Sequence, residues 1–108
     1  MENTSPFLAM QQVERQLKGL LRGVDAESLE PAEKKALSNL RRLSVDARLD
    51  IRDYELSETR DEQVKKMQAA RKRLAKLQAS VLSVGFVFGP ADVAQLTAQL
   101  EHIQSRLL

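Results

Sequence analysis

An uncharged stretch of ten residues, Val81 to Pro90, most constrains how this chain can fold. In a chain of 108 residues of which 30% are charged, the stretch holds two of the three phenylalanines, two of the four glycines and one of the three prolines. Apolar surface of this kind is expected to be buried, either within the chain or against another one. The glycines and the proline also predict that one helix ends here and that the next one begins at Pro90.

Helix-forming residues dominate the rest of the chain, and only 4% of its residues are aromatic. Apolar residues recur at helical spacing in four segments, which predict helices at residues 6–22, 30–55, 59–83 and 90–107. A chain of this length forms one domain at most. We therefore expect residues 1–108 to fold as a single all-α domain, a small bundle of about four helices with an aliphatic core.

The expected helix starts carry recognisable capping residues. Ser5 precedes Pro6 at the start of the first helix, and Ser28 is expected to cap the second. Thr59 and Glu62 form a capping-box pattern at the start of the third helix.

The second and third helices are expected to form a long antiparallel hairpin with a turn near residues 56–59. Continuing the apolar seam of the second helix beyond Tyr54 would place Asp61 and Gln68 on it, so the register changes at the turn. The alternative is one continuous helix of about 53 residues, about 80 Å long, which would have to dimerise to bury its seam. The first and fourth helices are shorter, and we expect the tip of the hairpin to project beyond them.

The second helix carries a further apolar strip, roughly opposite its main seam, formed by Val45, Leu49 and Leu56. A single neighbouring helix cannot cover both faces, so the strip predicts contact with another helix, from this chain or from a second copy. We interpret these three residues as a candidate interface with a partner or within an oligomer.

Phe86 and Phe88 permit two interpretations. They are expected to plug the open end of the bundle, where Phe7 would complete a small aromatic cluster. Alternatively, they form a docking surface and belong to the same candidate interface as the apolar strip.

Charge is distributed unevenly, although the formal net charge is only +2. Residues 25–62 contain eleven acidic and seven basic residues, whereas residues 63–80 contain six basic residues and no acidic one. A basic helix face can bind phosphates, but no aromatic residue is interleaved here to stack on bases. We favour pairing with Asp46, Asp50 and Asp53 across the hairpin, or a solvated helix face, and keep contact with nucleic acid as the alternative. The residues concerned are Lys65, Lys66, Lys72, Arg73 and Lys76.

The residues that most enzymes and metal sites require are scarce. The chain has no cysteine and a single histidine, His102. We therefore expect no catalytic, metal or cofactor-binding residues. The polar N-terminus and the lack of a long apolar run predict a cytoplasmic protein without a membrane partner, although attachment through the first helix is a weak alternative.

The sequence thus predicts a non-enzymatic module for protein–protein interaction, such as an adaptor, a scaffold or a chaperone-like subunit. We expect it to self-associate, most simply as a dimer. The alternative is a regulatory protein that binds nucleic acid through the basic face of the third helix.

Overall fold

The computed structural model describes residues 5–107, apart from the side chain of Phe86, and its regular elements in that range are all helical. Four of them are long and two are single turns. In chain order they are α1 (Pro6–Arg22), the 3₁₀ turn η1 (Ala26–Ser28), α2 (Pro31–Glu55), α3 (Arg60–Ser83), α4 (Gly85–Phe88) and α5 (Pro90–Ser105).

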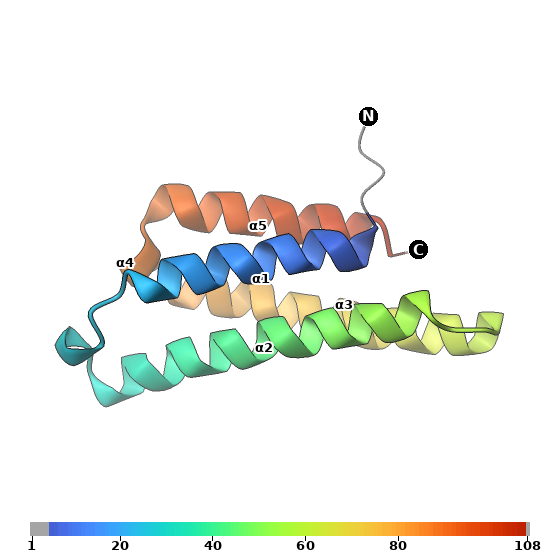
Figure 1. The fold of residues 1–108 in the computed structure, drawn as a ribbon, viewed down its shortest axis with the longest axis horizontal. Helices are drawn as coiled ribbons and strands as arrows, with labels where there is room; N and C mark the ends of the chain where they lie inside the picture. The colour runs from blue at the N-terminus through green and yellow to red at the C-terminus, as the bar shows by residue number, and fades with distance from the viewer. Residues whose placement is uncertain (1–4, 108) are drawn as a thin grey trace.

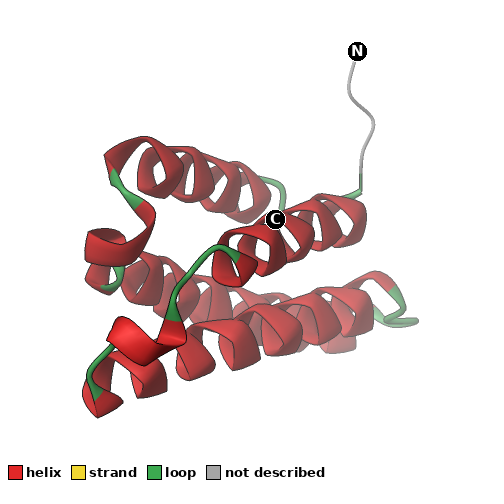
Figure 2. Cartoon of the chain, turned by 60° about the vertical axis from the view of Figure 1, so that its left-hand side comes forward, coloured by secondary structure: helices red, strands yellow, loops and turns green. Residues whose placement is uncertain are grey.

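The four long helices run alternately in opposite directions and form a bundle about 48 Å long (Figure 1). The α2 and α3 helices pack most closely, α1 lies against α2 and α5, and α5 completes the ring against α3 (Figure 2). The turn between Glu55 and Arg60 rules out one continuous helix. The predicted all-α bundle, built on an antiparallel α2–α3 hairpin, is confirmed.

The core is aliphatic and follows the predicted spacing in all four long helices, with one shift on α2. The most buried face of α2 includes Leu37 and Ser44, whereas Ala36 and Leu43, which recur at helical spacing with Leu40 and Ala47, are only partly buried. The face is rotated because α2 packs against α1 as well as α3. The Ser44 hydroxyl donates to the carbonyl oxygen of Arg41 at 2.7 Å, which satisfies this buried polar group within its own helix.

Two of the three predicted caps are present. Ser5 Oγ accepts from Leu8 N at 3.2 Å, and Thr59 Oγ1 accepts from Glu62 N at 3.2 Å. The prediction for Ser28 is wrong, because this residue belongs to η1. The cap of α2 is instead Glu30, whose backbone N–H donates to Glu33 Oε1 at 2.8 Å in a reciprocal capping box.

The stretch from Val81 to Pro90 was expected to separate α3 from α5. It does so, and it also contains a short additional helical turn, α4. Gly89 then adopts a φ of 88° and a ψ of 159°, which allows α5 to start at Pro90. Only glycine adopts this conformation readily. The Phe88 side chain is 8% exposed and belongs to the core, so little of it is left for a partner.

The expected contact of Phe7 with Phe88 is wrong, and the part of the cluster that involves Phe86 lies outside the described side chains. Phe7 starts α1 beside the hairpin tip, where its backbone N–H donates to Glu55 Oε2 at 2.8 Å. Phe88 lies instead beside Gly23 and Val24 at the other end of α1, about 25 Å away along the helix. The alternating helix directions separate the two residues.

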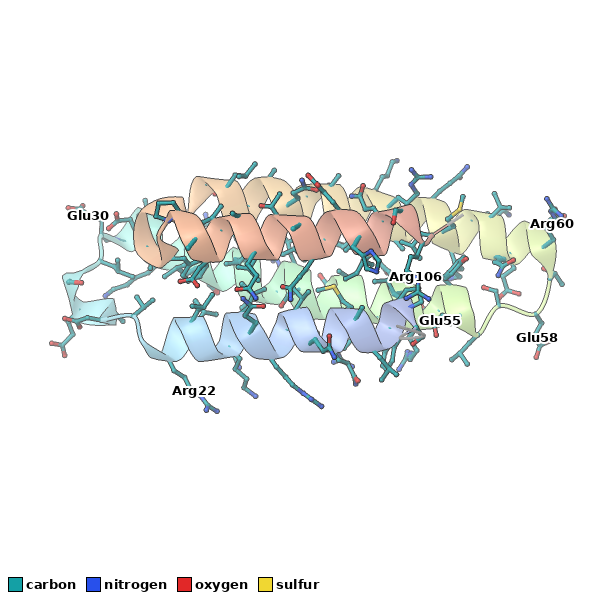
Figure 3. All side chains as sticks on the ribbon, turned by 90° about the horizontal axis from the view of Figure 1, so that it is seen from above. Arg22, Glu30, Glu55, Glu58, Arg60 and Arg106 are labelled. Atoms are coloured by element: carbon teal, nitrogen blue, oxygen red, sulfur yellow. The ribbon has the colours of Figure 1, made fainter. Side chains whose placement is uncertain are left out.

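The tip of the hairpin projects beyond α1 and α5, as predicted. The hydrogen bond to Glu55 places the start of α1 at the end of α2. Glu58 and Arg60 lie past that point, away from Glu55 and Arg106 (Figure 3). The last part of the hairpin therefore lacks the cover that α1 and α5 give to the rest.

Two glycines, Gly19 and Gly89, have room for a methyl group, yet alanine should have opposite effects at the two positions. Gly89→Ala should lower the free energy of unfolding by about 1–3 kcal/mol, because alanine resists its φ of 88°. Gly19→Ala, inside α1, should raise the free energy of unfolding by about 0.5–1 kcal/mol, because alanine reduces the conformational entropy of the unfolded chain. Urea unfolding followed by circular dichroism measures both changes, and two changes of the same sign would contradict the backbone conformations described for Gly89 and Gly19.

Replacing Phe88 should open a cavity at the end of the bundle. We expect Phe88→Ala to lower the free energy of unfolding by about 3–5 kcal/mol. Leu82→Ala is the control, since Leu82 is 59% exposed and its loss should change stability by less than about 0.5 kcal/mol. Equal, small effects of the two variants in urea unfolding would show that Phe88 is not a core residue.

Candidate interaction surfaces

The predicted second strip on α2 lies on the outside of the bundle. We call Val45 and Leu49, together with Leu56 at the C-cap of the helix, the outer strip of α2. Val45 and Leu49 are partly buried, whereas Leu56 is 69% exposed. Val45 lines a small cleft of about 80 Å³ together with Leu17 and Leu21 of α1. The first helix therefore covers the beginning of the strip and leaves its end open.

Ion pairs on both sides of α2 fix the direction in which this strip faces. On the side of α1, Arg48 Nε lies 2.6 Å from Glu14 Oε2. On the side of α3, Arg73 Nε lies 3.0 Å from Asp50 Oδ2, and its Nη1 lies 3.7 Å from Asp46 Oδ2. The strip lies between these two flanks and faces solvent.

Of the basic residues predicted to pair across the hairpin, Arg73 forms such ion pairs in the described part of the chain. Arg73 contacts both Asp46 and Asp50, whereas Asp53 pairs with Arg52 of its own helix at 3.5 Å. The remaining predicted basic residues are differently placed: Lys66 is partly buried, and three lysines are exposed with no ion pair formed within residues 5–107. These three are Lys65, Lys72 and Lys76.

A strip on α3 that sequence reasoning missed adjoins this basic face. We call Val64, Gln68, Arg71, Ala75 and Leu82 the outer strip of α3. All five side chains are exposed, and the two large apolar ones, Val64 and Leu82, are 41% and 59% exposed. Their separation of 18 residues is five helical turns, which places them on one face. That spacing is the signal by which the strip could have been found.

A shallow groove runs along the middle of this strip, where α3 meets the end of α5. Its volume is about 830 Å³. Met67 and Ala75 contribute apolar surface, and Gln104 is the contribution of α5. Arg71 and Lys72 are among the basic residues that line it, and none of its lining residues is acidic.

The projecting tip also holds an open hollow, of about 480 Å³. Polar side chains, including Glu58, Arg60 and Gln63, form most of its lining, beside Tyr54 and Met67. It is therefore a less suitable apolar docking site than either outer strip.

Groups of metal-binding side chains and membrane-spanning helices are both absent from residues 5–107. No three His, Cys, Asp or Glu side chains between Ser5 and Leu107 are grouped so that they could hold a metal ion. No helix in the same range is long and apolar enough to cross a membrane. The side chain of Phe86 lies outside the described part, so its predicted role at an interface stays a prediction.

Reversing the charge of the two neighbouring bases Arg73 and Lys72 should affect stability differently. Arg73→Glu removes two ion pairs and adds a third carboxylate beside Asp46 and Asp50, which should cost about 1–2 kcal/mol. Lys72→Glu removes no contact and should change stability by less than about 0.5 kcal/mol. Thermal unfolding at low salt measures both, and an equal loss in the two variants would show that the pairing contributes nothing.

Comparison with known proteins does not add to these observations. A scan of protein-family models and searches of curated proteins and of solved structures each found no match to this chain. Function is therefore inferred from the exposure, charge and geometry of the two outer strips.

Proposed function

We propose that this protein is a non-enzymatic helical interaction module that self-associates as a dimer through the outer strip of α2. The observation that carries the proposal is the exposure of Leu56, at 69% of its surface, at the end of an apolar strip that α1 covers only in part. Burying this strip against a second chain removes apolar surface from water.

The spacing of the strip suits a helix of a second copy. Its residues are four and seven positions apart, which is one and two turns, and the strip is about 16 Å long. An antiparallel copy centred near Leu49 brings the two Leu49 side chains together. It also brings Val45 within a turn of Leu56 of the partner subunit.

The charges around the strip are compatible with such a symmetric contact. Arg42, Arg52, Asp46 and Asp53 border it, so both signs are present. In the antiparallel arrangement the same flank of each strip faces its copy, which brings Arg42 within a turn of Asp53 of the partner subunit, and the symmetry repeats that pair. Opposite charges at these places favour the arrangement and fix its register more than they add stability.

The expected dimer is weak, because only three apolar residues form the strip and two of them are already partly buried. Contacts of this size are typical of transient association, in the micromolar range of dissociation constants. This range suits an adaptor, a scaffold or a chaperone-like subunit that exchanges partners.

Binding of nucleic acid is the second candidate function. It is supported by the exposure of Lys65, Lys72 and Lys76, on a helix that carries no acidic residue after Glu62. It ranks second because Arg73, which was expected to belong to the same face, is held by Asp46 and Asp50.

Replacing Leu56 should weaken the dimer without unfolding the chain. We expect Leu56→Ser to raise the dissociation constant at least tenfold, which corresponds to about 1.4 kcal/mol. Leu82→Ser is the matched control, a similarly exposed leucine on α3, and should leave the dimer unchanged. Sedimentation equilibrium over a range of concentrations provides the measurement.

Two results would contradict the proposal. One is a chain that stays monomeric up to about 500 μM, beyond the range expected for a transient contact. The other is a dimer that dissociates equally in the Leu56→Ser and Leu82→Ser chains, because the contact would then not depend on the outer strip of α2.

A further inference from the structure

The outer strip of α3 has the features of a second binding surface. Four large apolar side chains are exposed in the described part of the chain, and two of them, Val64 and Leu82, lie on this strip. They lie on one face of α3, about 27 Å apart along its axis. Exposed apolar side chains that recur on one face mark a contact more often than single scattered ones do.

Between these apolar ends the surface is basic. Arg71 and Lys72 line the groove in the middle of the strip, with Lys65 at its rim. No acidic residue occurs in the sequence from residue 63 to residue 91. The nearby acid of α5, Glu101, accepts a hydrogen bond from Gln78 Nε2 at 3.3 Å and is absent from the lining of the groove.

This charge pattern argues against a second copy as the occupant. An antiparallel symmetric pair that sets Val64 on Leu82 of the partner subunit has its axis near residue 73. Arg71, Lys72 and Lys76 of both chains then lie close together. A parallel symmetric pair sets each of these bases opposite itself. Either arrangement gathers like charges in the interface, which opposes association.

Nucleic acid is a poorer match than an acidic protein surface. Phosphates would neutralise the lysines and Arg71 but would leave Val64 and Leu82 in water. The sequence of α3 also contains no aromatic residue on which a base could stack. The occupant that satisfies both the charges and the apolar ends carries carboxylates and apolar side chains on one face.

We propose that the outer strip of α3 binds an acidic amphipathic helix of another protein. Apolar side chains about five turns apart on that helix would cover Val64 and Leu82, and carboxylates between them would face Arg71 and Lys72. The groove beside Gln104 receives the middle of the helix. The outer strip of α2 borders α1 and that of α3 borders α5, so the two contacts use different faces of the hairpin.

A synthetic peptide tests this assignment directly. The probe is an α-helical peptide of about 24 residues with leucines at the two ends of one face and glutamates between them, labelled for fluorescence anisotropy. We expect micromolar binding that weakens steeply with salt. The same peptide with lysine in place of glutamate should not bind.

Variants locate the peptide on the protein. The double variant Arg71→Glu/Lys72→Glu should weaken binding at least tenfold, and Leu82→Ser about fivefold. The control, Leu56→Ser, should bind the peptide as the natural chain does, which keeps the result independent of the proposed dimer. Circular dichroism checks that each variant is folded, and Arg71→Gln/Lys72→Gln, with an expected smaller loss, replaces the double variant if charge reversal unfolds it.

Three results would overturn the inference. The first is no binding of the acidic peptide at about 500 μM, beyond the affinity expected of a transient contact. The second is binding that the Arg71/Lys72 and Leu82 variants leave unchanged. The third is a DNA duplex that displaces the peptide and binds the Leu82→Ser chain as tightly as the natural one, which would assign the surface to nucleic acid.

Discussion

The packing of α2 against α3 is the contact on which the rest of the molecule depends. Each helix buries a seam of mostly aliphatic residues along about four to five turns, and the hairpin turn at Leu56–Thr59 keeps the two seams in register. Neither α1 nor α5 is long enough to form a comparable pair, and each packs on one side of the hairpin. Their positions follow from the hairpin, because the connections that lead to them leave from its open end.

The difference in length between the hairpin and its covering helices determines which residues stay exposed. Four helices of equal length would bury their seams from end to end. Here α1 begins beside Glu55, so Leu56 and Val64 lie where no neighbour covers them. Leu56 is therefore exposed because the α2–α3 hairpin is longer than the helices that cover it. It lies at the end of the outer strip of α2, whose first residue, Val45, packs beside α1.

Periodicity made most of the fold predictable, because every long helix has an apolar seam and most have a capping residue or a proline at the start. It failed where a second neighbour changed the outcome. Ser44 is buried because α2 packs on two helices, and Phe7 lies far from Phe88 because α1 starts at the hairpin tip and runs toward the open end. Ser28 failed as a cap because Asp25 starts a 3₁₀ turn there. The outer strip of α3 was missed because its apolar ends are five turns apart and a short window does not join them.

The two outer strips differ in the charged residues beside them, and this difference underlies the different partners proposed for them. The outer strip of α2 is bordered by both signs, and a symmetric contact can place Arg42 near Asp53 of the partner subunit. The outer strip of α3 has bases alone at its middle, and each symmetric contact would place them against themselves. Arg73 pairs with Asp46 and Asp50 of the same molecule. The two bases that precede it on α3, Arg71 and Lys72, are exposed on another face of the helix. The hairpin thus uses Asp46 and Asp50 to join α2 to α3 through Arg73, and the bases that it leaves unpaired are the charges on which the proposed acidic partner rests.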